Sequence, residues 1–166
     1  MDHDAFTDME KIGTLCMSQK IKPLALLIED DDDIIAILRL FLEAEGYRTR
    51  VIYNGGEALD HIDSMIELPT IVILDVMLPG IDGLTVLERL RRRPIWAKVP
   101  VIMVTSCSEG NDVRRAMAGG ANDYIVKPFH PRTLISRIQA LLASPTHNYS
   151  GNFSKSNDPI GTDKEM

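Results

Sequence analysis

The feature that most constrains this fold is an alternation, repeated along residues 23–143, between short apolar runs and stretches with helical spacing. A short continuous apolar run is typical of a strand buried on both faces, whereas apolar residues at every third or fourth position make one side of a helix. Strands are predicted at Leu24–Ile28, Arg48–Tyr53, Thr70–Leu74, Val101–Val104 and Tyr124–Val126. A helical stretch follows each strand, so the pattern predicts a βα repeat.

Helices are predicted at residues 34–42, 57–66, 84–92, 112–118 and 131–142. Strictly alternating strands and helices form an α/β fold, in which right-handed crossovers join the strands of an open parallel sheet and place helices on both of its faces. Sheets of this kind bind ligands outside the carboxyl ends of their strands, where the strand order reverses. The residues that follow the predicted strands are therefore the first candidates for a functional site.

The ends of two helices can also be predicted. Gly46 follows the first helix and is expected to end it, because glycine readily adopts the positive φ found there. One of Asp31, Asp32 and Asp33 is expected to cap its start, with Asp32 or Asp33 favoured. The basic run at residues 89–93 ends the third helix, and we expect it to be a solvated helix end rather than a docking patch.

The length and composition fit one domain of ordinary size. The chain has 166 residues, of which 45% are hydrophobic, enough to form a core. Residues 1–22 are mostly polar and aperiodic, and residues 144–166 are rich in Ser, Asn, Gly, Asp and Pro. We expect a flexible arm at 1–22, a domain at 23–143 and a disordered tail at 144–166.

Charge and cysteine content exclude several classes of protein. The net charge of -6 argues against a surface that binds nucleic acid or anionic lipid through charge alone. Cys16 and Cys107 lie far apart with no Cys-x-x-Cys pair, which indicates neither a disulfide framework nor a zinc site. No apolar run resembles a membrane span or a secretory signal, so we expect a cytoplasmic protein with no membrane partner.

The residues at the ends of four predicted strands are polar. They are Glu29-Asp30-Asp31-Asp32-Asp33 after the first strand, Asp75 after the third, Thr105-Ser106 after the fourth and Lys127-Pro128 after the fifth. Carboxylates crowded at one edge of a sheet repel one another and need a cation to remain ionised together. A hard divalent ion with oxygen ligands, above all Mg2+, meets that need.

Four segments at the ends of predicted strands occur in a specific order along the chain. They are Ile28-Glu29-Asp30-Asp31, Ile73-Leu74-Asp75-Val76-Met77-Leu78-Pro79-Gly80, Val104-Thr105-Ser106 and Asp123-Tyr124-Ile125-Val126-Lys127-Pro128-Phe129. Together they resemble the receiver domain of bacterial two-component response regulators. The resemblance covers residues 23–143 and implies a flavodoxin-like, doubly wound fold, with five parallel strands in the order 2-1-3-4-5 and helices on both faces.

The resemblance also implies the chemistry of the site. Asp75 would be the phosphoacceptor, with its carboxylate as the nucleophile. Mg2+ would be held by Glu29, Asp30, Asp75 and the backbone carbonyl of Met77. Lys127 would supply a fixed positive charge beside Asp75 or the arriving phosphate.

Two further residues carry the readout that the resemblance implies. Thr105 would donate its hydroxyl to a phosphoryl oxygen, and Tyr124 would be an aromatic switch that turns inward when Thr105 moves. The helix at 112–118, the strand of Tyr124 and the final helix would then form the face on which a downstream effector protein docks. Pro128 after Lys127 suggests a rigid turn, one that can be cis and that aims the lysine inward.

The resemblance implies a signalling module rather than a separate enzyme. The domain would catalyse its own Mg2+-dependent phosphorylation and dephosphorylation, with a sensor histidine kinase or a phosphotransfer protein as the donor. The sequence as given looks like a stand-alone receiver that acts through altered protein-protein binding and makes no direct contact with nucleic acid. The alternative is the receiver fragment of a longer DNA-binding transcription regulator, with residues 144–166 as its linker.

Other interpretations of the same residues are disfavoured. A Mg2+-dependent phosphatase of the haloacid dehalogenase type also uses an aspartyl nucleophile, but it expects a second Asp two residues later, where this chain has Met77. A flavodoxin-like cofactor carrier would have a Gly- or Ser/Thr-rich phosphate loop after its first strand, and the acidic run found there would repel an FMN phosphate. A receiver that has lost its chemistry is disfavoured because all the required side chains are present.

Overall fold

The computed structural model describes residues 21–106 and 110–143. Most of the predicted arm at 1–22 and all of the predicted tail at 144–166 lie outside the described residues. Among the helices that the structure describes, none is both long and apolar enough to cross a lipid bilayer. The elements are β1 (Leu24–Ile28), α2 (Asp32–Ala44), β2 (Arg48–Ile52), α3 (Gly55–Ser64), β3 (Ile71–Asp75), α4 (Gly83–Arg92), β4 (Val101–Thr105), α5 (Gly110–Ala118), β5 (Asp123–Val126) and α6 (Pro131–Ala143).

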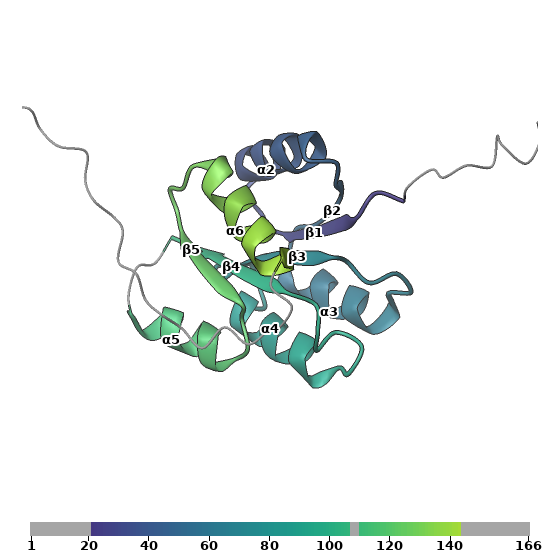
Figure 1. Cartoon of the computed structure of the whole chain (residues 1–166). Coiled ribbons are helices and arrows are strands. Elements are labelled where there is room, and N and C mark those ends of the chain that lie inside the picture. The colour runs from purple at the N-terminus through teal and green to yellow at the C-terminus, as the bar shows by residue number, and fades with distance from the viewer. Residues whose placement is uncertain (1–20, 107–109, 144–166) are drawn as a thin grey trace, which may run out of the picture.

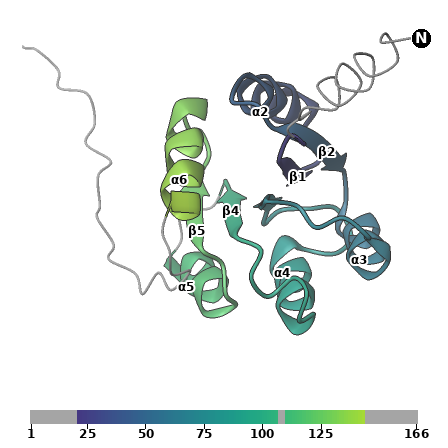
Figure 2. The ribbon, with the colours of Figure 1, turned by 45° about the vertical axis from the view of Figure 1, so that its right-hand side comes forward.

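The strands form one parallel sheet in the order β2-β1-β3-β4-β5. The helices α2 and α6 cover one face of the sheet, and α3, α4 and α5 cover the other (Figure 1); Figure 2 shows the same two layers from a second direction. The predicted doubly wound α/β fold with strand order 2-1-3-4-5 is confirmed. Since the order reverses between β1 and β3, the carboxyl ends of these two strands flank the expected binding point.

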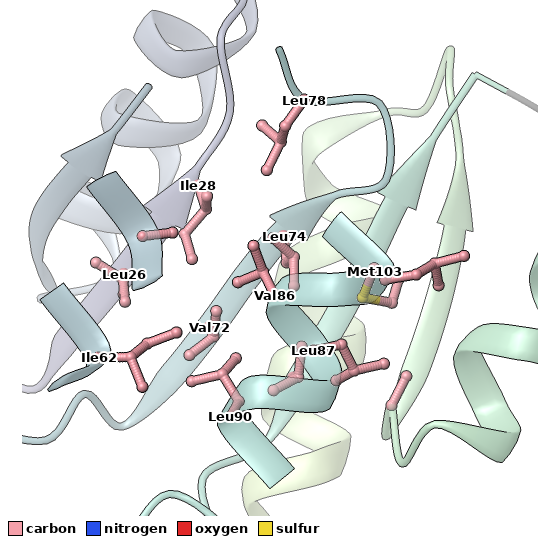
Figure 3. Packing of buried hydrophobic residues seen from close by; sticks show 14 of the residues in the cluster. Leu26, Ile28, Ile62, Val72, Leu74, Leu78, Val86, Leu87, Leu90 and Met103 are labelled. Carbon is pink, nitrogen blue, oxygen red and sulfur yellow. The ribbon is translucent and has the colours of Figure 1, made fainter. Parts of the chain in front are cut away.

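The sheet separates two hydrophobic clusters. Successive residues of a strand point to opposite faces, so Leu26 and Leu27 belong to different clusters. Leu26 packs in the same cluster as Ile62 of α3 and Leu87 of α4 (Figure 3), whereas Leu27 packs with residues of α2 and α6. Because both faces are covered, every residue of β1, β3 and β4 is buried, which explains the continuous apolar runs in the sequence.

Trp96 belongs to the cluster that α3 and α4 cover. Its side chain is fully buried, and its indole Nε1 donates a hydrogen bond to the backbone carbonyl of Ile62 at 3.3 Å. A buried indole N–H needs such an acceptor, because leaving it without a partner would cost free energy. The contact ties the segment after α4 to the last part of α3.

The caps of α2 differ in part from those predicted. Asp31 caps the start of the helix, because its carboxylate accepts hydrogen bonds from the backbone N–H groups of Asp33 (2.9 Å) and Ile34 (3.1 Å). The preference for Asp32 or Asp33 as the cap is wrong, since both already lie in the first turn. Gly46 follows the last turn with a φ of 87°, so the predicted glycine end is confirmed.

Several element boundaries differ by one or two residues from those predicted. The helix α3 starts at Gly55 rather than Glu57, because the side chain of Asn54 accepts a hydrogen bond from the backbone N–H of Glu57 at 2.8 Å and thereby caps the helix. Asp75 and Thr105 are the last residues of β3 and β4, not the first residues after them. Both candidate site residues are therefore held in place by the sheet itself.

The basic run that ends α4 is only partly a solvated helix end. Arg92 is exposed, as expected, but Arg91 is partly buried. The guanidinium of Arg91 donates hydrogen bonds to the carbonyl oxygens of Gly120 (2.8 Å), Val99 (3.0 Å) and Trp96 (3.2 Å) and to Oδ1 of Asn122 (3.0 Å). We call these residues the Arg91 cluster. The expectation of a solvated end is wrong for Arg91, because its side chain joins α4 to the segments that precede β4 and β5.

Candidate functional site

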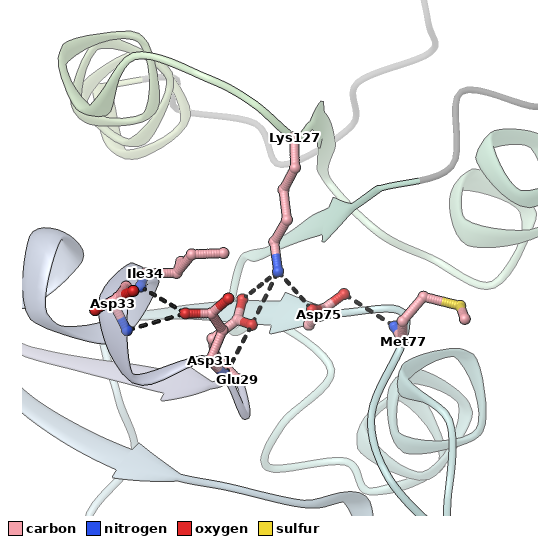
Figure 4. A network of polar contacts seen from close by, with 7 residues as sticks. All are labelled: Glu29, Asp31, Asp33, Ile34, Asp75, Met77 and Lys127. Carbon is pink, nitrogen blue, oxygen red and sulfur yellow. Dashed lines mark hydrogen bonds and ion pairs between the residues drawn. The ribbon is translucent and has the colours of Figure 1, made fainter.

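Side chains from the carboxyl ends of three strands meet at one point of the sheet edge (Figure 4). Glu29 follows β1, Asp75 ends β3 and Lys127 follows β5. The Nζ atom of Lys127 lies 2.6 Å from Oδ2 of Asp75 and 2.8 Å from Oε2 of Glu29. The structure therefore brings together three candidate residues from separate stretches of the chain.

The contact between Lys127 and Glu29 was not predicted from the sequence. In the sheet, β3 and β4 lie between β1 and β5, so β1 and β5 are about 14 Å apart at the usual strand spacing. Lys127 crosses β4 with its long stem, and Glu29 covers the remaining gap from the other side. The length of these two side chains, combined with the predicted strand order, is the signal that could have revealed the pair.

Glu29 and Asp75 are buried carboxylates, with exposed fractions of 2% and 3%. Burial penalises the ionised form and raises the pKa of Glu29 to about 7, although the hydrogen bond from Lys127 opposes the shift. The negative charge of Asp75 also raises the pKa of Glu29. For Lys127, burial alone would lower the pKa, but its hydrogen bonds to Asp75 and Glu29 outweigh burial and raise it, so the ammonium group stays charged.

Three carboxylates gather at the carboxyl ends of β1 and β3, two of them buried and one exposed. Glu29, Asp30 and Asp75 each contribute one oxygen that lies within 4.8 Å of the others, and we call these residues the acid cluster. One ammonium group faces them, so the cluster keeps an excess of negative charge when all three are ionised. Asp30 is exposed, and oxygen donors at this separation fit a hard divalent cation such as Mg2+.

The two oxygens of Asp75 have different partners. Oδ2 accepts a hydrogen bond from Lys127, and Oδ1 accepts one from the backbone N–H of Met77 at 2.9 Å. Donors on both oxygens fix the orientation of the carboxylate. The backbone of Met77 is thereby held against the acid cluster while its side chain is 63% exposed. Ligation of a metal by the Met77 carbonyl stays a prediction.

Thr105 and Tyr124 lie on the two neighbouring strands β4 and β5. Thr105 is fully buried, and its backbone carbonyl accepts a hydrogen bond from the N–H of Lys127 at 2.7 Å. Tyr124 pairs with Met103 in the sheet and packs, partly buried, against the cluster under α3, α4 and α5. The peptide bond between Lys127 and Pro128 is cis, an isomer that the sequence had left open. The predicted roles of Thr105 and Tyr124 in readout stay predictions.

A family model described as the response regulator receiver domain matches residues 25–139. Among curated relatives, the phosphate regulon transcriptional regulatory protein PhoB of Rhizobium meliloti is 41% identical over 120 residues, which is 72% of this chain and 52% of the relative. The chain thus spans about half the length of the curated relatives that it matches.

Two solved structures have the same fold. A CheY-like response regulator receiver domain protein from Methanospirillum hungatei has a TM-score of 0.67 at 29% identity, and the match covers 73% of this chain and 94% of that one. The receiver domain of the sensor histidine kinase PA1611 from Pseudomonas aeruginosa has a TM-score of 0.67 at 25% identity and covers 74% and 99%. That second structure has a magnesium ion coordinated in its active site cleft.

Proposed function

This chain belongs to the response regulator receiver domain family of two-component systems, and we propose that it accepts a phosphoryl group on Asp75. The observation that carries the proposal is the contact of Lys127 with this buried carboxylate at the end of β3, at 2.6 Å between Nζ and Oδ2. A carboxylate held at a strand end, with a donor on each oxygen, is a nucleophile of fixed position.

The proposed transfer is a displacement at phosphorus. An oxygen of Asp75 forms the new bond to phosphorus while the bond from phosphorus to an imidazole nitrogen of the donor breaks, and that nitrogen keeps the electron pair. The donor is a phosphohistidine of a sensor histidine kinase or phosphotransfer protein, which we place in the cytoplasm with this chain. Lys127 compensates negative charge as the carboxylate and the phosphoryl oxygens approach one another.

We assign the acid cluster and the backbone carbonyl of Met77 as the residues that hold Mg2+. The fit rests on the three carboxylate oxygens within 4.8 Å of one another and on the exposure of Asp30. When bound, the ion supplies positive charge to the phosphoryl oxygens. The residues of the chain orient the acceptor, and the same groups serve the removal of the phosphoryl group by water.

The readout that we propose runs from the site to the face formed by α5, β5 and α6. Thr105 donates its hydroxyl to the phosphoryl oxygen, and Tyr124 responds by changing its packing. The motivation is that the Thr105 carbonyl is bonded to the backbone of Lys127, so β4 and β5 are joined at the site. A change at Asp75 is thereby passed to the surface on which an effector protein docks.

The function is tested by incubating the full chain with acetyl phosphate and Mg2+ and measuring its intact mass. Wild-type protein should gain one phosphoryl group, and Asp75→Asn should gain none. Asp60→Asn, a change of an exposed aspartate on α3, is the matched control and should be modified like wild type. Equal modification of wild type and Asp75→Asn would refute the acceptor assignment.

A second candidate function is the receiver part of a DNA-binding transcription regulator. It is favoured by the curated relatives, which are transcriptional regulatory proteins about twice as long as the matched segment. Sequencing the gene beyond the codon for Met166 tests it. An open reading frame that continues into a DNA-binding domain would support this candidate, and a stop codon directly after Met166 would rule it out.

A further inference from the structure

The loop between β3 and α4, residues 76–82, carries the one proposed Mg2+ ligand that is not a side chain. Both of its ends are fixed by backbone hydrogen bonds: the N–H of Val76 donates to the carbonyl of Val104 at 2.9 Å, and the N–H of Gly83 donates to the carbonyl of Val76 at 2.9 Å. Unlike a side-chain ligand, a backbone carbonyl cannot change its position by rotating about side-chain bonds, and it moves only with the backbone. The path of this loop therefore decides where the Met77 carbonyl lies.

The loop makes an unusually close contact with Gly55, the first residue of α3. A Cβ atom placed on Gly55 would lie 2.0 Å from the carbonyl oxygen of Ile81 and 2.8 Å from its carbonyl carbon. Non-bonded heavy atoms prefer separations of about 3.5 Å or more. The contacted atoms belong to the backbone, so no side chain can rotate away to make room. Any residue larger than glycine at this position must displace either the helix or the loop.

The helix is the part that resists displacement. Asn54 caps its start through the N–H of Glu57, and Ala58 and Ile62 bury the helix in the core with exposed fractions of 0% and 1%. The loop is held by the buried side chains of Val76 and Leu78, but it lacks the successive backbone hydrogen bonds of a helix, and the Met77 side chain within it is 63% exposed. A side chain at position 55 would therefore move the loop.

We propose that Gly55 is a positioning residue for the divalent cation: its bare backbone lets the loop from β3 to α4 lie close enough to α3 for Met77 to face the acid cluster. Gly55 touches neither the cation nor the phosphoryl group and acts through Ile81. The inference rests on the proposed function, because that function assigns the Met77 carbonyl as a ligand.

The next residue along the helix, Gly56, provides a matched control. A Cβ atom on Gly56 would meet only Oδ1 of Asn54, at 3.4 Å, which is an ordinary contact with a side chain. Gly55→Ala and Gly56→Ala are the same chemical change in the same helical turn. They differ in whether the added methyl group meets the loop.

The test measures Mg2+ binding to the full chain by calorimetry, with no phosphodonor present. Gly55→Ala should weaken binding about tenfold, as expected when a group that orients a ligand is disturbed, and Gly56→Ala should bind like wild type. Hydrogen exchange should become faster in residues 76–83 of Gly55→Ala while α3 keeps its protection. Equal Mg2+ affinities in the two variants would overturn the proposal.

A second variant keeps the proposal testable if Gly55→Ala does not fold. Ile81→Ala keeps the backbone and Cβ atoms that meet Gly55 but removes the rest of a side chain that packs against the hydrophobic cluster containing Ala58 and Ile62 of α3, so the loop is held less firmly against the helix. This variant should bind Mg2+ measurably more weakly than wild type. Unchanged affinity in Ile81→Ala would count against the proposal, because Mg2+ binding would then not depend on how the loop is held against α3.

The failure of this inference can be told apart from a failure of the proposed function. If Mg2+ affinity depends on Gly55 but wild type gains no phosphoryl group from acetyl phosphate, the positioning role stands and the acceptor assignment falls. If wild type is phosphorylated on Asp75 but Gly55→Ala and wild type bind Mg2+ equally, the acceptor assignment is supported and the positioning role of Gly55 is refuted.

Discussion

The two ends of the sheet both hold buried charge, but in opposite forms. At the carboxyl ends of the strands, the acid cluster sets three carboxylates against the ammonium group of Lys127. At the amino ends of β4 and β5, the Arg91 cluster surrounds one guanidinium with neutral oxygens. Burial lowers the pKa of Arg91, yet a guanidinium stays protonated throughout the range in which proteins are folded.

Hydrogen bonding does not distinguish the two ends, because no buried side-chain nitrogen or oxygen in the described part of the chain lacks a partner. They differ in whether their charge can change. The Arg91 cluster has a permanent charge, so its contribution to the free energy of unfolding should be constant. The acid cluster contains Glu29, whose pKa is about 7, and can take up a proton or a cation.

The largest predicted effect is on the Arg91 cluster. Arg91→Ala should lower the free energy of unfolding by about 4 kcal/mol, because four hydrogen bonds worth about 1 kcal/mol each are lost. Urea denaturation followed by circular dichroism measures the loss, which should be the same with and without Mg2+. Arg92→Ala is the exposed control and should change stability by less than about 0.5 kcal/mol. Equal losses in both variants would show that the cluster has no special role.

The next largest effect is the pH dependence that the acid cluster gives to the free energy of unfolding. The pKa of Glu29 is raised in the folded state from 4.5 to about 7, so folded protein binds more protons than unfolded protein in this interval. The contribution of Glu29 to stability is therefore complete below pH 4.5 and is lost as the pH rises through about 7. With a chelator present, the free energy of unfolding of wild type should fall over this pH interval by about 3 kcal/mol more than that of Glu29→Gln. Parallel pH curves for wild type and Glu29→Gln would contradict the shift.

A smaller effect on stability follows from removing the ammonium group of Lys127. Lys127→Ala should lower the free energy of unfolding by about 2 kcal/mol at pH 8 in chelator, because hydrogen bonds between charged groups are lost, while the desolvation cost of the ammonium group is also removed. Adding Mg2+ should recover part of the loss. Lys98→Ala changes an exposed lysine and is the control. If Lys127→Ala lowers stability no more than Lys98→Ala does, this prediction is wrong.

The smallest predicted effect is an increase in stability. Asp75→Asn should raise the free energy of unfolding by about 1 kcal/mol at pH 8 in chelator, because it removes a negative charge beside Glu29. The same variant should gain less stability from Mg2+ than wild type does. Thermal denaturation with and without Mg2+ measures both differences. A destabilised Asp75→Asn protein would mean that the pairing with Lys127 outweighs the repulsion.

Much of the fold could be predicted because burial on both faces has a direct signature in sequence. The strands β1, β3 and β4 are apolar throughout for that reason, and the polar residues that end them mark the functional edge. The choice among Asp31, Asp32 and Asp33 as the cap of α2 could not be read in the same way, because it depends on where the backbone turns after β1.

The features that were missed involve partners with no sequence signature. Arg91 looks like any basic residue at a helix end, and three of its four acceptors are backbone carbonyls, which every residue possesses. The contact of Gly55 with Ile81 is also made to a backbone carbonyl, so the sequence does not show why a glycine is needed at this position. By contrast, Asp75 and Lys127 act through side chains, and the family resemblance carried by their two segments implied that they would meet.

The buried position of Trp96 gives this chain a built-in optical probe. It is the only tryptophan in the sequence, and its indole lies in the core with Nε1 bonded to the Ile62 carbonyl. Its emission should shift to longer wavelength when the core opens to water. Because Trp96 precedes β4, at the edge opposite the acid cluster, its fluorescence should report whether the chain is folded while remaining indifferent to what occupies the cluster.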